Sequence, residues 1–435
     1  MLRVVSILLT SCLTLLGCGS DSGGGNNDAT AATGLTYYKD VKPIMDAKCA
    51  TCHYNGGVAP FSLTSFEEVE PHAGVAMLAV RDGIMPPWKA EDDCNDYAGD
   101  FSLTAEQRQT IIDWVDTGAA EGTPADEGQA LPDNRLTMSR VDATLTMPQQ
   151  YTPTQSPDDY RCFLIPWPAE YTSTKYITGF RATPGNEKVV HHVIAFLAQP
   201  GQVAGYQQLD ADESGPGYTC FGGSGGPSQE WIGGWAPGNN GSDFPANSGI
   251  AVEPGSMIVM QVHYNTLKAG AGSDQTSIEL KLDDNVDKIG RIQPWTNPSW
   301  VSGTGMVIPA GNADVMHSFE LDMTLLSGGA PITIYSANLH MHTLGKSGVV
   351  KIKRGGGGED CMLRIDDYDF DWQDSYGFKN PVTFNQGDSM YLECHWDNSP
   401  ENQPMVNGEQ RLPITQQWGE GTTDEMCLTS FYVTY

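Results

Sequence analysis

Short apolar runs separated by Gly- and Pro-rich turns fill the chain from about residue 138 to residue 435. Examples are KYITGFRA, VHHVIAFLA, MIVMQVHYNT, SIELKL, HSFELDMTLL, ITIYSANLHMH, VVKIKR, SMYLECHW and TSFYVTY. Runs of this length, rich in β-branched and aromatic residues, are typical of antiparallel strands. They are too many for one sandwich. We therefore predict two antiparallel, jelly-roll-like β-sandwich domains, over residues 138–285 and 286–435.

Residues 36–122 have a different pattern, which favours a small all-α domain. The stretch TYYKDVKPIMDAKCATCH can form one helix that runs into a cysteine motif. In SLTAEQRQTIIDWVDTGAAEG, Thr104 and Gln107 match a capping box, and Gly118 is placed to end the helix. A linker rich in Gly, Pro, Asp and Glu follows over residues 123–137. The predicted fold class is therefore mainly β, preceded by a helical domain.

The N-terminal sequence MLRVVSILLTSCLTLLGCGS places Arg3 before an apolar run that closes on Cys18. This pattern is typical of an export signal and is too short to span a membrane. The ending LLGC resembles a bacterial lipoprotein box, which implies that residues 1–17 are removed and Cys18 is lipidated. Because Gly19 follows, the resemblance implies an outer-membrane anchor in the cell envelope. Residues 18–35 would then be a flexible tether; a soluble secreted protein is the alternative.

The formal net charge of −30 disfavours nucleic acid and anionic membrane surfaces as partners. Membrane association would therefore come from the lipid alone. Outside the signal, the anchor and the CATCH motif, six cysteines remain, an even number that predicts disulfides in an oxidising compartment. They are Cys94, Cys162, Cys220, Cys361, Cys394 and Cys427.

The stretch CATCH at residues 49–53 fits the motif Cys-x-x-Cys-His. In this motif, Cys49 and Cys52 attach haem c covalently and His53 binds the iron. A thiol redox pair and a zinc half-site are the alternatives, but an exported chain with a small helical segment favours haem. Met85 in RDGIMPPW is the candidate sixth ligand, since Met-Pro before an aromatic residue resembles the axial-methionine loop of class I cytochromes c. Core packing is the alternative for Met85.

Five of the nine histidines lie in strand-like runs. Side chains two residues apart on a strand share a face, so His340 and His342 can converge on one metal with further ligands from elsewhere. His191 and His192 are adjacent, so both can bind one metal only at a strand end or bulge; a core pair is the alternative. Imidazole suits copper, zinc and iron, so these residues and His263 leave the metal open.

Taken together, VHHVIAF, QVHYN, HMHTLGK and TTDEMCLTSFYVTY occur in the order of the motifs of a known family. They resemble the copper type II, ascorbate-dependent monooxygenases, which include peptidylglycine α-hydroxylating monooxygenase and dopamine β-monooxygenase. The resemblance covers residues 150–435. It implies two copper ions, one that stores electrons and one that binds O2. The implied ligands are His191, His192 and His263 for the first, and His340, His342 and Met426 for the second.

The same resemblance implies a disulfide between Cys394 and Cys427 beside Met426. A soft thioether favours Cu(I), the state that binds O2, which agrees with the ligand set. Packing beside the disulfide is the alternative for Met426.

Three positions depart from the peptide-amidating members, which keep an Arg, an Asn and a Tyr there for the peptide. This chain has Asn338, Leu428 and Ser430 instead. Without the arginine, a peptide carboxylate loses its bidentate partner, so peptide amidation is disfavoured. Asn338 and Ser430 are candidate substrate-facing residues.

Three further features are expected to be structural. They are His317, His395 and the acidic run DDYDFD at residues 366–371, for which a solvated edge is expected and Ca²⁺ binding is the alternative.

The sequence thus predicts a copper-dependent monooxygenase that hydroxylates an aliphatic C–H bond of a small organic substrate with O2. One oxygen atom would enter the product and the other would leave as water. The reductant would be ascorbate or a protein electron donor, and the haem on the same chain is expected to relay electrons because fusion raises its effective concentration. The alternatives are a non-catalytic copper- and haem-binding electron-transfer lipoprotein and a structural, zinc-bound pair of sandwiches.

Overall fold

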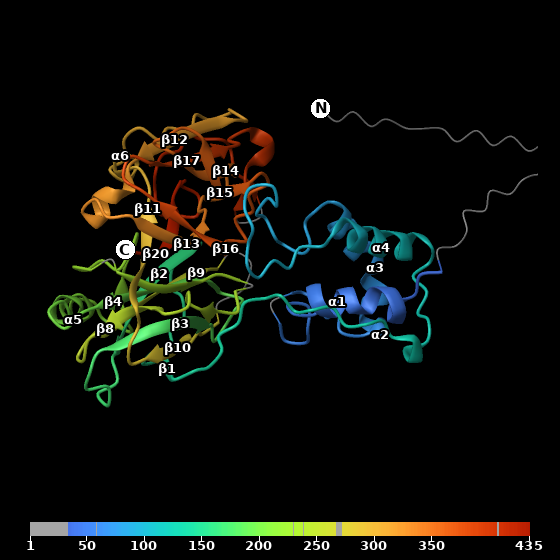
Figure 1. Ribbon diagram of the computed structural model, residues 1–435, viewed down its shortest axis with the longest axis horizontal. Coiled ribbons are helices and arrows are strands. Elements are labelled where there is room, and N and C mark those ends of the chain that lie inside the picture. The colour runs from blue at the N-terminus through green and yellow to red at the C-terminus, as the bar shows by residue number, and fades with distance from the viewer. Residues whose placement is uncertain (1–33, 58, 229, 238, 267–271, 407–408) are drawn as a thin grey trace, which may run out of the picture.

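The computed structural model describes residues 34–57, 59–228, 230–237, 239–266, 272–406 and 409–435 (Figure 1). The predicted signal, Cys18 and nearly all of the tether lie outside these residues. Among the described residues, no helix is both long enough and apolar enough to cross a membrane. The chain is mainly β, as predicted, and Figure 1 shows a helical region beside two β regions.

The helical region packs around its own small core. Its elements are the π-helical turn η1 (Tyr37–Val41), α1 (Lys42–Lys48), α2 (Phe66–Val69), the 3₁₀ turn η2 (Glu70–His72), α3 (Ala73–Arg81), α4 (Ala105–Asp116) and the 3₁₀ turn η3 (Pro124–Asp126). α4 has the predicted capping box, in which the Gln107 N–H donates to the Thr104 hydroxyl at 3.2 Å and the Thr104 N–H donates to the Gln107 side chain at 3.0 Å. The helical stretch from Tyr37 to Lys48 ends directly before Cys49.

The first β region lies around a second core. Its strands are β1 (Ala143–Thr146), β2 (Asp158–Pro166), β3 (Lys175–Thr183), β4 (Val190–Ala198), β5 (Tyr218–Thr219), β6 (Trp231–Trp235), β7 (Ser242–Asp243), β8 (Ser248–Val252), β9 (Met257–Asn265) and β10 (Ser277–Asp283), with α5 (Val203–Asp212) after β4. β9 pairs with β2 on one side and with β4 on the other. Its residues from Met257 to Tyr264 are all buried, which explains its nearly continuous apolar sequence.

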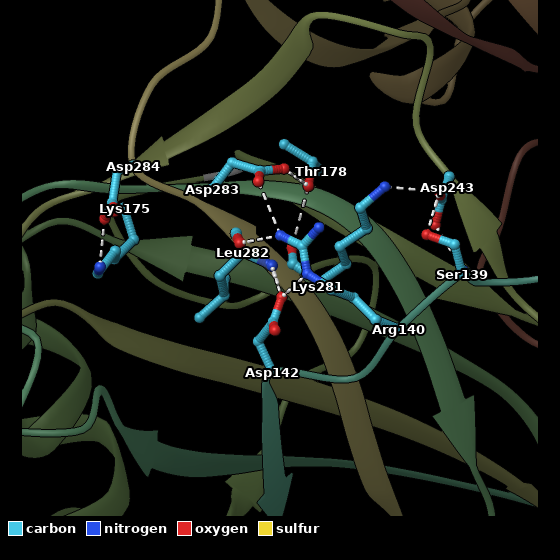
Figure 2. Close-up of polar contacts among 10 residues, drawn as sticks. All are labelled: Ser139, Arg140, Asp142, Lys175, Thr178, Asp243, Lys281, Leu282, Asp283 and Asp284. Atoms are coloured by element: carbon cyan, nitrogen blue, oxygen red, sulfur yellow. Dashed lines mark hydrogen bonds and ion pairs between the residues drawn. The ribbon is translucent and has the colours of Figure 1, made fainter.

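Polar side chains fix the point where the chain enters the first β region (Figure 2). The Ser139 N–H and hydroxyl donate to the Asp243 carboxylate at 2.9 and 2.6 Å. Arg140 forms ion pairs with Asp142 and Asp283, each at 2.7 Å. Such solvent-accessible pairs contribute only about 0–1 kcal/mol each, so their role here is to hold the end of the linker against β7 and β10.

The second β region comprises the remaining strands and encloses a third core. Its elements are β11 (Lys288–Trp295), α6 (Pro298–Val301), β12 (Val315–Leu321), η4 (Met323–Ser327), β13 (Ile332–Asn338), β14 (Gly345–Lys353), β15 (Glu359–Ile365), β16 (Ser375–Phe384), β17 (Ser389–Trp396), η5 (Pro400–Asn402), β18 (Met405–Val406), β19 (Glu409–Gln410) and β20 (Thr429–Thr434). One sheet has the order β12-β17-β14-β15, and the other contains β16, β13, β20 and β11.

Two details of this region differ from, or add to, the sequence prediction. HSFELDMTLL is not one strand, because β12 ends at Leu321 and the Asp322 side chain accepts the Thr324 N–H to begin the 3₁₀ turn η4. β11 pairs with β20 of its own region and also with β6 and β8 of the first. The strand that opens the second region therefore joins the sheets of both.

Residues 88–101, between α3 and α4, leave the helical region and pack on the second β region (Figure 1). Cys94 forms a disulfide with Cys361 of β15. Tyr97 forms an antiparallel bridge with Phe378 of β16 and is buried in the third core. A segment of the helical region is thus part of the packing around the second β region.

Candidate metal centres

β4 carries two adjacent histidines beside the histidine of β9. The register of β4 against β9 shifts between Val190 and His192, which is the irregularity that two adjacent ligands require on a strand. His192 lies opposite His263 of β9. The bulge expected for residues 191–192 is present, and three imidazoles meet at one place on the sheet.

The three rings present their Nδ1 atoms to one another. The Nδ1 atoms of His191 and His192 are 3.4 Å apart, and those of His192 and His263 are 3.3 Å apart. Ligand atoms of all three lie within 4.8 Å of one another. Burial lowers the pKa of His192 and of His263 well below the usual value, so both rings are neutral near pH 7. Three imidazoles whose nitrogen atoms converge in this way form a donor set that fits a metal ion.

Two side chains of β2 hold the His263 ring. Asp158 Oδ1 accepts a hydrogen bond from His263 Nε2 at 2.9 Å, which leaves Nδ1 to face the other histidines. The Tyr160 ring stacks on the His263 ring at a centroid distance of 4.0 Å and an interplanar angle of 5°. Tyr160 and His263 are opposite each other in the β2–β9 register.

The segment after β13 brings His340 and His342 beside the methionine. β13 ends at Asn338, and His340 then exchanges backbone hydrogen bonds with Leu428, at 2.8 and 3.1 Å. That bridge sets the segment that carries the two histidines beside the segment that carries Met426. The ring centroids of His340 and His342 are 5.1 Å apart, and Met426 is only 6% exposed.

Partners on other segments orient these two rings. His340 Nδ1 donates to Gln373 Oε1 at 2.6 Å, and His342 Nδ1 donates to the Asp424 carbonyl at 3.2 Å. These bonds leave Nε2 of each ring for a metal. Burial lowers the pKa of His340 to about 4 and that of His342 well below its usual value. Both rings are therefore neutral and able to act as ligands.

Glu425 ties the backbone of the methionine segment to the histidine segment. Its buried carboxylate accepts hydrogen bonds from the His342 N–H at 3.1 Å, the Leu344 N–H at 2.7 Å and the Trp396 indole at 2.8 Å. Burial raises the pKa of Glu425 to about 8. Because Glu425 directly precedes Met426, these bonds fix the methionine relative to His342.

Three disulfides are present among the described residues. Cys394–Cys427 joins β17 to the residue after Met426, which confirms the pairing implied by the family resemblance. The pairs that the sequence left open are Cys94–Cys361 and Cys162–Cys220.

A cleft of about 1080 Å³ opens between the two β regions. His192 of the first cluster lines it, as do His340, His342 and Met426. Aromatic side chains make up much of the remaining wall, among them Phe180, Trp231, Trp235, Phe244, Phe378 and Tyr432. Both sets of predicted ligands therefore reach one largely apolar cavity.

The predicted substrate-facing residues also line this cleft. Asn338 Oδ1 accepts hydrogen bonds from the Ser430 N–H at 2.6 Å and the Ser430 hydroxyl at 3.1 Å. Leu428 contributes an apolar side chain beside them. The place where the amidating relatives keep an arginine is thus occupied here by a neutral amide already engaged with a neighbour.

The acidic run at residues 366–371 is only partly a solvated edge. Asp366, Asp367 and Asp371 are exposed as expected, but the two aromatic residues of the run turn inward. Phe370 stacks on His191 at a centroid distance of 4.8 Å and lies edge-on to His342 at 5.9 Å. One phenyl ring therefore contacts a histidine of each cluster.

The CATCH motif begins directly after α1. Cys49 and Cys52 are unpaired with each other, and His53 Nδ1 donates to the Phe61 carbonyl at 3.0 Å. That bond leaves His53 Nε2 available, which is the arrangement a metal-binding imidazole needs. Met85 follows α3 and is 37% exposed; the contacts of the described residues do not join it to His53. Two thiols and an oriented imidazole fit a covalently attached haem.

The two remaining histidines of the second β region lie away from the cleft lining. His317 Nε2 donates to the Val307 carbonyl at 2.9 Å. His395 contacts Asp314 at 3.0 Å and Glu393 at 3.3 Å. These contacts agree with the structural roles expected for them.

Several residues at the site were not singled out from the sequence. They are Asp158, Tyr160, Phe370, Gln373 and Glu425, and each acts by contacting a histidine or the methionine segment from another element. Asp158 and Tyr160 alternate on one strand, which could have marked them as sharing a face. The other three have no pattern that relates them to a metal ligand, because only the tertiary fold brings them together.

Comparison with known protein families gives two matches in chain order. Residues 143–270 match the N-terminal domain of the copper type II ascorbate-dependent monooxygenases. Residues 301–435 match the C-terminal domain of the same enzymes. Together the two matches cover more than half of the chain, including all six proposed copper ligands.

Curated relatives are similar over the same part of the chain. DBH-like monooxygenase protein 2 of Mus musculus is 26% identical over 63% of this chain and 42% of its own length. Tyramine beta-hydroxylase of Caenorhabditis briggsae is 23% identical over 58% and 40%, and dopamine beta-hydroxylase of Equus caballus is 23% identical over 70% and 47%. The chain spans less than half the length of these relatives. With both domains of one family matched in order, the chain belongs to the copper type II ascorbate-dependent monooxygenases.

Proposed function

We propose that this protein is a copper-dependent monooxygenase that hydroxylates an aliphatic C–H bond of a small organic substrate with O2. The observation that supports this most is that histidines of both clusters and a buried methionine line a single cleft. Membership of the family supports copper as the metal. O2 and a small-molecule substrate are the reactants that the family uses.

The chemistry of each donor set fits copper. His191, His192 and His263 would hold one ion through three imidazole nitrogens, and His340, His342 and Met426 would hold the other with a soft thioether. Copper would supply the electron transfer and the activation of O2 that protein side chains cannot provide. The chain's own part is to keep these imidazoles neutral by burying them and to orient them through hydrogen bonds to Asp158, Gln373 and Asp424.

The cleft would bind and shield the substrate. Its aromatic walls favour an apolar molecule and exclude water from the reacting bond. Asn338 and Ser430 offer neutral polar groups beside Met426 rather than a cation. We therefore propose a substrate that presents no free carboxylate at this end of the cleft, which separates it from peptide amidation.

Residues 36–122 would form a cytochrome c domain, with haem attached to Cys49 and Cys52 and bound by His53 and Met85. Such a haem would supply single electrons to the copper region. The packing of residues 88–101 on the second β region supports this, because it holds the two parts of one chain close together. The external reductant would be ascorbate or a protein electron donor.

The predicted lipid anchor at Cys18 completes the proposal by placing the enzyme in the bacterial cell envelope, on the outer membrane. Three disulfides are consistent with an oxidising compartment of this kind. Mass spectrometry of the mature N-terminus from a bacterial host tests this directly. A diacylglyceryl group on Cys18 is the expected result, and an unmodified N-terminus elsewhere in the chain would contradict it.

The activity is tested by metal analysis and oxygen uptake on the haem-loaded, full-length protein. Two copper ions per chain, a Cu(II) EPR signal and substrate-dependent uptake of O2 are expected. Two bound zinc ions would instead indicate a structural pair of β regions. Bound copper that cycles between oxidation states without consuming O2 would indicate an electron-transfer protein.

A further inference from the structure

Asp158 and Tyr160 each contact both the first histidine cluster and the segment that carries Met426. The two residues are separated by one position on β2, so their side chains share a face of the sheet. Asp158 accepts the hydrogen bond of His263 Nε2, and Tyr160 stacks on the same ring. A movement of the His263 ring would therefore displace two side chains of β2.

Their other contacts are with Thr422 and Glu420 of the second β region. Asp158 Oδ1 accepts the Thr422 hydroxyl at 2.6 Å, and Oδ2 accepts the Thr422 N–H at 3.2 Å. The Tyr160 hydroxyl donates to the Glu420 carbonyl at 3.0 Å. Asp158 is 12% and Thr422 is 4% exposed, so water competes little for these bonds.

Residues 420–426 connect these contacts to the second histidine pair. Beyond Thr422, the Asp424 carbonyl accepts from His342 Nδ1, and the Glu425 carboxylate accepts from the His342 N–H. Met426 follows directly. The path from His263 to Met426 and His342 thus consists of hydrogen bonds and four residues of backbone.

We propose that Asp158 and Tyr160 are positioning residues that couple the first metal site to the second. A metal ion held by the first cluster would polarise the His263 Nε2–H group and strengthen its bond to Asp158. The same oxygen, Asp158 Oδ1, also accepts the Thr422 hydroxyl. A change in the hydrogen bond from His263 therefore alters the hydrogen bond from Thr422. Filling the first site would therefore set the position of residues 420–426 and, with them, Met426. The inference rests on the proposed function only in taking copper as the metal.

The test measures Cu(I) affinity at the second site by competition with a chelator, in the haem-loaded, full-length protein. The His192→Ala variant removes the first site while leaving the bond between Asp158 and His263. The coupling ratio is the Cu(I) affinity of the second site when the first site is filled, divided by the same affinity when His192→Ala has removed the first site. A ratio of about 5–150 is typical of coupled sites. Sulfur scattering in the copper X-ray absorption spectrum reports Met426 ligation independently of activity.

Two variants break only the hydrogen bonds between the two β regions. Thr422→Val removes the hydroxyl donated to Asp158, and Tyr160→Phe removes the hydroxyl donated to Glu420 while keeping the stacked ring. Each is expected to reduce the coupling ratio at least threefold and to weaken sulfur scattering, with the Cu(II) EPR signal of the first site unchanged. Thr423→Val is the matched control, since it makes the same substitution one residue later, where no side-chain hydrogen bond is described, and should leave the ratio unchanged.

A ratio near one in the wild-type protein would overturn the proposal, as would a ratio that both variants leave intact. Loss of the first-site EPR signal in Thr422→Val or Tyr160→Phe would show that these residues serve His263 alone, which also contradicts it. Two coupled copper sites without hydroxylation would refute the proposed function and leave the coupling standing. Hydroxylation by a protein whose two sites bind copper independently would refute the coupling and leave the proposed function standing. A wild-type protein that binds no copper would refute both the coupling and the proposed function.

Discussion

At the scale of single residues, the two metal sites depend on histidine rings that are neutral and correctly oriented. Burial lowers the pKa of four of the ligand histidines, which are His192, His263, His340 and His342. Hydrogen bonds through one ring nitrogen orient His263, His340 and His342. The methionine differs, because its thioether has no proton to lose and is positioned only by its neighbours. The chemistry of the second site therefore depends on a side chain held by backbone contacts.

Met426→Leu tests the proposed thioether ligand. The substitution conserves volume and should cost less than about 1.5 kcal/mol of stability. Product formation should fall by more than the roughly 10–100-fold that is typical of losing a residue that only orients a ligand, and the sulfur scattering of bound Cu(I) should disappear. Met341→Leu is the matched control, because Met341 is fully buried between His340 and His342 and belongs to the core. Equal activity in both variants would rule out Met426 as a ligand.

Gln373→Leu removes the acceptor for His340 Nδ1. The ring is then free to rotate or to change tautomer, and loss of such a partner typically costs 10–100-fold in metal affinity or activity. Gln373→Glu keeps an acceptor oxygen and should restore much of the affinity. Copper titration of the second site measures both variants; wild-type affinity in Gln373→Leu would show that the bond does not orient the ring.

The lowered histidine pKa values predict that the metal-free protein is acid-sensitive. In the unfolded chain a histidine takes up a proton near pH 6.5, whereas folded His340 resists protonation down to about pH 4. The unfolded state therefore binds more protons between these values, and stability is lost as the pH falls through this window. The free energy of unfolding, measured from pH 7 to pH 4, should decline. His340→Asn should make the decline shallower, and an identical slope would count against the neutral ring.

At the scale of elements, the bulge in β4 and the bridge between His340 and Leu428 make the ligand geometry possible. Both were foreseeable in part. Adjacent histidines that bind one metal from a strand demand an irregularity, which β4 has. The strand expected to run through His340 and His342 ends earlier, at Asn338, and only His340 forms a bridge. The capping box of α4 and the pairing of Cys394 with Cys427 also followed from local pattern and family resemblance.

Other elements were beyond local sequence. HSFELDMTLL has a continuous β-type pattern, yet the capping side chain of Asp322 ends the strand. Phe370 lies in an acidic run, where nothing marks an aromatic ring as a neighbour of His191. The pairing of β11 with both sheets and the route of residues 88–101 are set by contacts between residues far apart in the chain.

At the scale of the whole molecule, residues 88–101 hold the helical region to the second β region. The disulfide between Cys94 and Cys361 closes a loop with a sequence separation of 267. Lys89 adds an ion pair with Asp367 at 2.8 Å, and Trp88 packs against Tyr376. The segment between α3 and α4 is thus docked on the second β region.

Replacing both Cys94 and Cys361 by Ser tests this docking. Loss of a disulfide across a long loop typically costs about 2–5 kcal/mol. Denaturant unfolding should show that loss, and trypsin should cleave at Lys89 faster than in the wild-type protein. The corresponding Cys162 and Cys220 double variant is the control, because it should lower stability without exposing Lys89. Equal protection of Lys89 in all three proteins would show that the disulfide does not secure the segment.

The most direct test of the monooxygenase activity is ¹⁸O2 labelling of the copper- and haem-loaded protein, with ascorbate as reductant and a metabolite extract as the source of substrate. The wild-type protein should form a hydroxylated product that carries one ¹⁸O atom, and the Met426→Leu variant should not. A protein that binds copper at both sites and is reduced, yet labels no molecule in the extract, would contradict the proposed activity.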